Sequence, residues 1–388
     1  MKTSFSPIKW CVYVGMFLTG ITIIGFESMI PQIMDYMSIE YIGIGNMSLS
    51  MSGAYLLTVL WAGARIDSRG GAVRLSGWTM ALLAIVCLLF LSIRSYAVNL
   101  VLCAVMGGLN GINGATLNAL AFDAGGREAG KTLGNLHFFF AAGAIAAPPF
   151  ADITTRLGAS PKTPFLILSI PFAILSILFF SCSEIKGGSK SSESLSWRRI
   201  LKTRSLILLG CAIGIYVGVE VSMAIWTTKF CQTFHSMSSG QSALCLSLLW
   251  TGLSAGRLIC SGISSRFSER KILALLSTGS LLSIMTTIQM PQSFPFWSLA
   301  LGFFMTGFFF SGHFPLIMIE GEKITPSNKG KVIGMFSAAA GVGACILPWG
   351  VSAIAQKGNL QTGLMLPAAF MVILSAGFIY WNVYGENK

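Results

Sequence analysis

Long apolar segments alternate with short polar breaks along the whole chain. Dividing the sequence at its charged and Pro/Gly-rich breaks leaves twelve apolar runs. Each has about 20 residues and can therefore cross a ~30 Å hydrocarbon core as an α-helix. The runs lie near residues 10–34, 44–64, 75–93, 98–121, 132–153, 164–182, 205–230, 242–263, 271–290, 295–319, 331–354 and 361–384. The pattern predicts an all-α membrane protein with twelve transmembrane helices.

Composition and charge agree with this prediction. Of the 388 residues, 54% are hydrophobic and 10% are charged, whereas a soluble domain carries about 25% charged residues. With both termini in the cytoplasm, 20 of the 26 Lys and Arg residues fall in cytoplasmic loops and five in outer loops. This asymmetry follows the positive-inside rule. The net charge of +12 is thus explained by insertion in a bilayer, and it does not indicate a nucleic-acid partner.

Motifs of enzymes and metalloproteins are missing from the sequence. The nine cysteines are scattered through apolar runs without CxxC or Cys/His metal-ligand spacing. No Walker loop, catalytic triad or dinucleotide-binding glycine pattern occurs. The sequence therefore predicts neither enzymatic activity nor a metal or other cofactor. The first apolar run is too long for a signal peptide, and we expect it to remain as the first span.

Two segments of the chain have similar sequences. KTLGNLHFFFAAGAIAAPP begins at residue 131, and KVIGMFSAAAGVGACILPW begins 200 residues later at 331. A second pair, GFE at 25–27 and GVE at 218–220, recurs at a spacing of 193. Two matches near half the chain length are typical of transporter repeats.

The repeats predict two six-helix bundles, at residues 1–182 and 205–388. The polar segment 183–204 is predicted to be the cytoplasmic linker between them. Its second half is basic and contains Trp197, which fits a short helix on the membrane surface, although a disordered tether fits equally.

Charged side chains inside the apolar runs are the first candidates for function, because burying a charge in hydrocarbon costs on the order of 3 kcal/mol. Glu27 and Glu220 lie in the first run of each half, and we expect them at a similar depth. Each can bind and release a proton or hydrogen-bond a substrate. The alternative is a structural carboxyl capped by a hydroxyl such as that of Ser28 or Ser222. Arg257 is a possible counter-ion or ligand for an anion, or it snorkels to the headgroups.

Uncharged polar and aromatic residues form a second group of candidates. His137 and His313 can titrate near neutral pH or simply join helices by hydrogen bonds. Trp226 follows Glu220 by six residues and can stack on a ring. The amides are those of Asn113, Asn118 and Asn135, with Asn110 nearby. They suit a polyhydroxylated solute, but they also suit contacts between helices.

The loop after the second run reads Gly63-Ala-Arg-Ile-Asp67-Ser-Arg-Gly70. This GxxxDxxG pattern resembles the signature between the second and third spans of the major facilitator superfamily. The resemblance implies two six-helix bundles, alternating access, and a role of Gly63, Asp67 and Gly70 in the cytoplasmic gate. The second half carries Arg266 where the first has Asp67.

Two further patterns resemble the fucose–galactose–glucose:proton symporter branch of that superfamily. They are Asn135-Leu-His137-x-x-Phe140-x-x-Gly143 and Tyr216-x-Gly218-x-Glu220 followed by Trp226. The resemblance implies hexose uptake coupled to protons, with Glu27 near the position of the first-span carboxylate of that branch. Gly114 stands where the branch has a fourth-span glutamate, so Glu220 is the candidate for that role.

We therefore expect a proton-coupled symporter for a sugar or sugar-like solute. The superfamily implies a monomer, and the branch implies the bacterial cytoplasmic membrane. Two alternatives remain open. One is a proton-coupled exporter of amphipathic compounds, for which 18 Met and 27 Phe suit an adaptable cavity. The other is a non-transporting sensor or assembly partner that docks through the basic linker.

Overall fold

The structure is a computed structural model that describes residues 7–69, 71–157, 160–184, 202–263, 266–325 and 329–384. All regular secondary structure in these ranges is helical. Twelve helical segments are long and apolar enough to cross a membrane, which confirms the all-α fold with twelve spans. Helices suit the hydrocarbon core because each satisfies its backbone polar groups internally.

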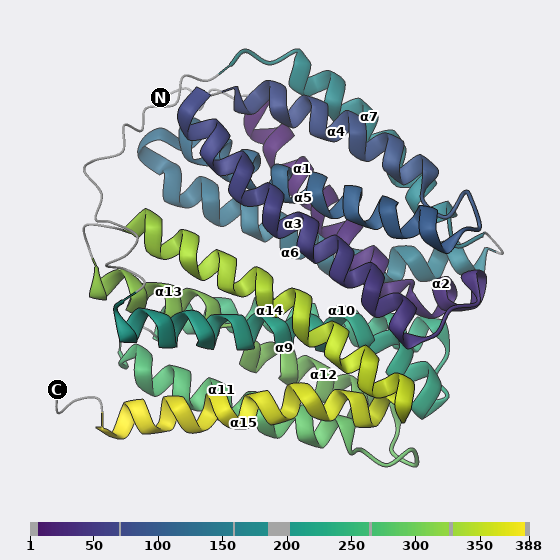
Figure 1. The fold of residues 1–388 in the computed structure, drawn as a ribbon, viewed down its shortest axis with the longest axis vertical. Coiled ribbons are helices and arrows are strands. Elements are labelled where there is room, and N and C mark those ends of the chain that lie inside the picture. Colours follow the sequence, from purple (N-terminus) through teal and green to yellow (C-terminus); the bar gives the residue numbers. More distant parts are fainter. Residues whose placement is uncertain are drawn as a thin grey trace. The chain divides into compact units, whose positions relative to one another are not determined.

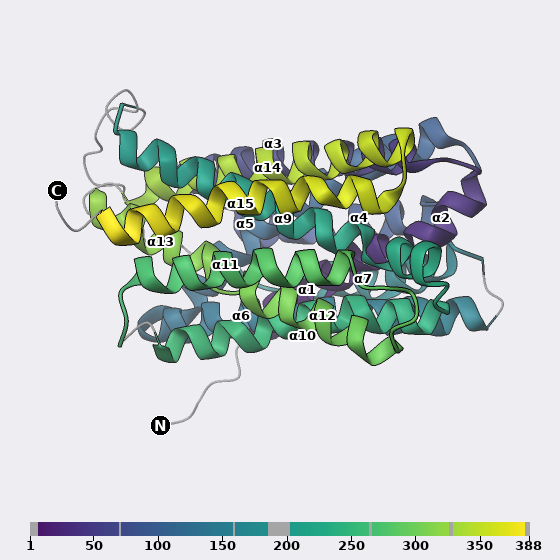
Figure 2. The same ribbon diagram turned by 90° about the horizontal axis from the view of Figure 1, so that it is seen from below.

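The chain divides into two compact units. The first comprises Met1–Ser38 and Ser50–Lys190, and the second comprises Ile39–Leu49 and Ser191–Lys388. In each unit the helices bundle side by side (Figures 1 and 2). The helices before the linker are α1 (Pro7–Ser28), α2 (Ile30–Met37), α3 (Tyr41–Arg69), α4 (Ala72–Leu89), α5 (Tyr96–Gly125), the short 3₁₀ helix η1 (Gly126–Glu128), α6 (Ala129–Arg156) and α7 (Thr163–Phe180). After it come α9 (Arg204–His235), α10 (Ser239–Ile263), α11 (Glu269–Ile288), α12 (Phe296–Phe310), α13 (His313–Ile324), α14 (Lys329–Lys357) and α15 (Leu360–Tyr384).

The repeated glycines lie where two helices of one unit touch backbone to backbone. A Cβ on Gly143 of α6 would overlap the carbonyl oxygen of Phe17 on α1. A Cβ on Gly343 of α14 would overlap the carbonyl oxygen of Gly214 on α9. Small residues of this kind allow close approach between membrane helices, which associate mainly by packing. The internal repeat therefore encodes the same helix pair in both units.

The same contacts compare the first helices of the two units. A Cβ on Gly218 of α9 would lie 2.7 Å from the Gly343 carbonyl oxygen, whereas one on Gly25 of α1 would meet nothing within 4 Å. Gly25 and Gly218, which the 193-residue repeat pairs, therefore have different surroundings within their units.

Two predicted runs are interrupted helices. The first continues past α1 into α2, with Met29 between them. The tenth, predicted as one helix near 295–319, is divided at Ser311 and Gly312 into α12 and α13. An adjacent Ser and Gly is a common place for a helix to bend or break. The break puts His313 at the first position of a new helix.

The linker predicted at 183–204 lies mostly outside the described residues, which omit 185–201. Its beginning is fixed to the first unit. Glu184 accepts hydrogen bonds from the backbone N–H groups of Val73, at 3.3 Å, and Arg74, at 2.8 Å. These groups open α4, whose N-cap residue Gly71 has no side chain to cap them. A carboxylate is favoured there by the helix dipole.

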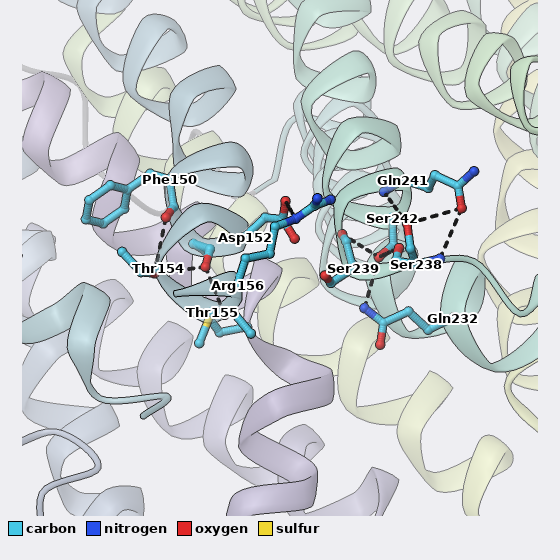
Figure 3. Close-up of polar contacts among 12 residues, drawn as sticks. Phe150, Asp152, Thr154, Thr155, Arg156, Gln232, Ser238, Ser239, Gln241 and Ser242 are labelled. Atoms are coloured by element: carbon cyan, nitrogen blue, oxygen red, sulfur yellow. Dashed lines mark hydrogen bonds and ion pairs between the residues drawn. The ribbon is translucent and has the colours of Figure 1, made fainter. Parts of the chain in front are cut away.

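A capping box starts α10 in the second unit (Figure 3). The Oγ of Ser238 accepts a hydrogen bond of 3.3 Å from the Gln241 N–H, and the Gln241 side-chain oxygen accepts one of 3.1 Å from the Ser238 N–H. Gln232 near the end of α9 donates to the Ser242 hydroxyl at 2.9 Å. The reciprocal bonds give partners to backbone N–H groups that have none within the helix, and they fix the turn between α9 and α10.

Candidate functional site

A polar cluster lies inside the second unit, where α9, α10 and α13 contribute one or two side chains each. Tyr216 and Glu220 are one turn apart on α9, and the Tyr216 hydroxyl donates a hydrogen bond to Oε2 of Glu220. Tyr216 is 1% exposed, so its hydroxyl needs a partner within the protein. The carboxyl of Glu220 supplies it.

His313 joins this cluster from α13. Its ring stacks on that of Tyr216 with a centroid separation of 4.8 Å and an interplanar angle of 8°. Phe310 and Phe378 also lie against the pair, at 6.0 Å from Tyr216 and 6.4 Å from His313. The imidazole is fully buried. Two residues that are 97 positions apart in the sequence thus form one aromatic stack.

The hydrogen bonding of His313 identifies its tautomer. Nδ1 lies 3.2 Å from the carbonyl oxygen of Phe310, which can only accept a hydrogen bond. Nδ1 therefore carries the hydrogen, and Nε2 of the neutral ring keeps a lone pair. Nε2 is buried and has no hydrogen-bond partner among the described residues. It is an unused acceptor within the described part of the chain.

Arg257 supplies the positive charge near this cluster. It lies on α10, half-buried, and its guanidinium acts electrostatically on both Glu220 and Tyr216. The sequence left open whether Arg257 is a counter-ion or reaches for the headgroups. The electrostatic interaction with Glu220 favours the counter-ion. Of the predicted site residues, Glu220, Arg257 and His313 are brought together.

Trp226 lies on the same helix but contacts other residues. Its side chain is fully buried, and its ring meets Tyr41 of the same unit edge-on at 5.5 Å. The indole Nε1 has no hydrogen-bond acceptor within the described part of the chain. A buried donor of this kind suits a polar ligand atom.

The predicted residues of the first unit are more dispersed. Glu27 is 4% exposed and lies one residue before the end of α1. Asn113 donates a hydrogen bond of 2.7 Å to the Thr19 hydroxyl, which favours the helix-joining alternative for this amide. Asn118 donates to the Gly114 carbonyl of its own helix at 2.7 Å. Asn110 is 1% exposed, and neither of its side-chain polar atoms has a hydrogen-bond partner within the described ranges.

The remaining predicted residues lie on α6 and at the end of α3. Asn135 and His137 are exposed on α6. Gly63 lies in α3, and a Cβ there would meet nothing within 4 Å. Gly70 and the side chain of Asp67 lie outside the described residues, so the predicted gating contact has no structural description.

Sequence reasoning missed Tyr216 as a member of the site. The signal was its spacing, because residues at i and i+4 share one face of a helix and Tyr216 precedes Glu220 by four. No sequence pattern indicated that Tyr216 stacks on His313, because this contact depends on where α13 begins.

Comparison with known proteins identifies the family. The family model described as Major Facilitator Superfamily matches residues 12–348. A yeast protein, "Bypass of stop codon protein 6" of Saccharomyces cerevisiae, is 21% identical over 402 residues, covering 92% of this chain and 78% of its own.

Two solved structures share the fold. The nucleoside transporter NupG, in a point-mutant form, superposes with a TM-score of 0.81 at 15% identity, covering 96% of this chain and 98% of its own. A bacterial homolog of the human lysosomal transporter Spinster, inward-facing and occupied, gives 0.78 at 11% identity, covering 98% and 97%. The chain belongs to the major facilitator superfamily and is a multi-pass membrane protein of this family of secondary transporters.

Proposed function

We propose that the protein carries a small polar solute rich in hydrogen-bond donors, a sugar or a nucleoside, together with protons by alternating access of its two bundles. The observation that supports this is the cluster of the half-buried Glu220 and Arg257 with the buried His313 and Tyr216. Intramembrane ionisable groups are rare and mark substrate or proton pathways.

The cluster offers acceptors as well as the N–H donors of Arg257. Nε2 of His313 is a lone-pair acceptor, and the Glu220 carboxyl presents further acceptor sites. Hydroxyl and N–H groups are the matching donors. A sugar or a nucleoside carries several, and a nucleoside is the cargo named for the structurally similar NupG. The patterns shared with the hexose:proton symporter branch favour a hexose as the alternative cargo.

Two carboxyls are the candidates for proton coupling. Glu220 would exchange a proton as its surroundings change between hydrated and dry, and its electrostatic interaction with Arg257 supports this role. Glu27 is the candidate of the first unit. Asn118, Asn135, His137 and Trp226 remain proposed solute contacts, and Gly63, Asp67 and Gly70 remain the proposed gate.

A thermal-shift screen tests the substrate class. Purified full-length protein is mixed with single hexoses, sugar acids, nucleosides or lipophilic cations at acidic and at alkaline pH. A compound that binds the native state raises the melting temperature by mass action. We expect stabilisation by one hexose or nucleoside, weakened in His313→Phe, which removes the Nε2 acceptor. Stabilisation by lipophilic cations alone would contradict the proposal and favour an exporter of amphipathic compounds.

Flux in proteoliposomes tests the coupling. The compound found in the screen is supplied radiolabelled, with and without an inward proton gradient. We expect Glu220→Gln to abolish gradient-driven accumulation while solute exchange persists. Asp152→Asn is the control, because Asp152 pairs with Arg156 at 2.7 Å in the other unit (Figure 3). Full accumulation in the Glu27→Gln, Glu220→Gln double variant would refute proton coupling through these carboxyls.

A further inference from the structure

We propose that Tyr216 is a positioning residue that links Glu220 to the break in the tenth span. Its hydroxyl fixes the carboxyl of Glu220 and its ring fixes the imidazole of His313. The inference rests on the proposed function only in naming this cluster as the site. The contacts that carry it are independent of any solute.

The hydroxyl has one role. Tyr216 is almost fully buried, and its hydroxyl donates to Oε2 of Glu220 one turn along α9. Side chains at i and i+4 meet on one helix face, so this bond selects one orientation of the carboxyl. The carboxyl of Glu220 is therefore held by Tyr216.

The ring has another role. Its face covers that of His313 at 4.8 Å and 8°, and the edge of Phe310 closes one side at 78° to the Tyr216 ring. The position of the imidazole is thus set by a side chain of α9, across a helix–helix contact. Loss of the Tyr216 ring would leave the imidazole beside a cavity.

His313, whose ring is held by Tyr216, also bonds to the residue that ends α12. α12 ends at Phe310, and the last carbonyl groups of a helix lack a partner within it. The Nδ1–H of His313 donates to the Phe310 carbonyl at 3.2 Å, from the first residue of α13. One imidazole therefore ties the end of α12 to the start of α13. Its orientation fixes the local geometry of the break.

The other end of α13 carries an ion pair. Nζ of Lys323 lies 2.8 Å from Oε1 of Glu269 on α11 and 3.0 Å from Oε1 of Glu320. α13 has 12 residues, so the same helix carries the His313 contact at one end and this ion pair to α11 at the other.

Carboxyl modification tests the hydroxyl. Dicyclohexylcarbodiimide modifies protonated carboxyls in apolar surroundings, and mass spectrometry reports the modified fraction of Glu220 relative to Glu27 in the same molecule. We expect Tyr216→Phe to raise this ratio about fivefold, because Glu220 loses a hydrogen bond of about 1 kcal/mol that holds its carboxyl. Tyr13→Phe is the matched control, since Tyr13 is buried and stacks on Phe139 at 5.2 Å and 7°. An unchanged ratio in Tyr216→Phe would overturn the role of the hydroxyl.

Hydrogen exchange tests the ring. We expect peptides covering residues 310–316 to exchange several-fold faster in Tyr216→Leu, and as in wild type in Tyr216→Phe, which keeps the stack. His313→Phe keeps an aromatic ring but removes the Nδ1–H. It should accelerate exchange at the break while leaving the Glu220 modification ratio unchanged. Wild-type exchange at the break in both Tyr216→Leu and His313→Phe would overturn the link.

Neither assay contains a solute or a proton gradient. The link between Tyr216, Glu220 and the break can therefore hold even if flux shows that Glu220 does not couple protons. Conversely, proton-coupled flux lost in Glu220→Gln together with an unchanged labelling ratio in Tyr216→Phe would keep the proposed function and reject the positioning role.

Discussion

Asn113 of α5 donates a hydrogen bond of 2.7 Å to the hydroxyl of Thr19 on α1, and both side chains are buried. The Thr19 hydroxyl in turn donates to the Gly15 carbonyl at 2.9 Å. Double-mutant cycles on such bonds between membrane helices give about 0.6 kcal/mol on average. We expect Thr19→Val and Asn113→Leu to be non-additive by an energy of this size, measured as thermal stability in detergent.

Asn118→Leu provides the comparison, because its amide donates to the Gly114 carbonyl of its own helix. The losses of thermal stability caused by Thr19→Val and by Asn118→Leu should therefore be additive in the double variant. If Thr19→Val and Asn113→Leu were additive as well, Asn113 would be available to the solute rather than committed to α1.

Because Gly143 lies against the backbone of α1, even a methyl side chain at this position should lower the stability of the protein. Even Gly143→Ala would force a Cβ against the backbone of Phe17. Since backbone cannot move aside as a side-chain tip can, we expect a loss of stability of about 1–3 kcal/mol. Gly134→Ala on the same helix meets nothing within 4 Å, and its higher helix propensity can add up to about 1 kcal/mol. Equal melting temperatures for the two variants would contradict the contact.

Asn99 stabilises the turn between α4 and α5. Its Oδ1 accepts from the Leu91 N–H at 2.8 Å, and its Nδ2 donates to the carbonyls of Ile93 at 2.7 Å and Ser95 at 2.8 Å. Leu91 adopts a φ of 59°, which is rare for a residue with a side chain.

We expect Asn99→Ala to lower stability by about 3 kcal/mol, from three buried hydrogen bonds at about 1 kcal/mol each. Thermal unfolding in detergent measures it. Asn135→Ala, at an exposed position of α6, should unfold like wild type. A similar small effect of both substitutions would show that the turn holds without Asn99.

Because Glu184 binds the first N–H groups of α4, the start of the linker should stabilise the start of this helix. Glu184→Gln weakens the bonds to Val73 and Arg74, and a cap contributes about 1 kcal/mol. The amides of these two residues should exchange hydrogen about fivefold faster. Glu128→Gln is the control, because Glu128 precedes α6 without forming a side-chain cap. Unchanged exchange in Glu184→Gln would show that the linker does not secure this helix.

Much of the fold follows from local sequence. The twelve spans are recognisable because a bilayer requires about 20 apolar residues per helix and leaves no partner for an unpaired backbone group. The signature loop and the internal repeat likewise depend on residues close in sequence, and the family match agrees with them. The interruption at Ser311 and Gly312 was missed, because a short break within an apolar run leaves the hydropathy unchanged.

The candidate site follows from sequence only in part. Glu220, Arg257 and His313 could be singled out because charged or titratable groups are costly inside the membrane. Their association could not be foreseen, since it depends on the packing of α9, α10 and α13. The same applies to Asn113, whose amide looked suited to a solute but is bonded to Thr19.

The sequence by itself determined the number of spans, their order and the glycines repeated in both units, because each depends on the composition of one segment against a hydrocarbon solvent. Only the tertiary structure decided which residues of neighbouring helices meet, such as Gly143 and Phe17. It also decided that Tyr216 and His313 share one stack. Helix–helix contacts of this kind join residues about a hundred positions apart, and an apolar helix surface carries too little pattern to specify them in advance.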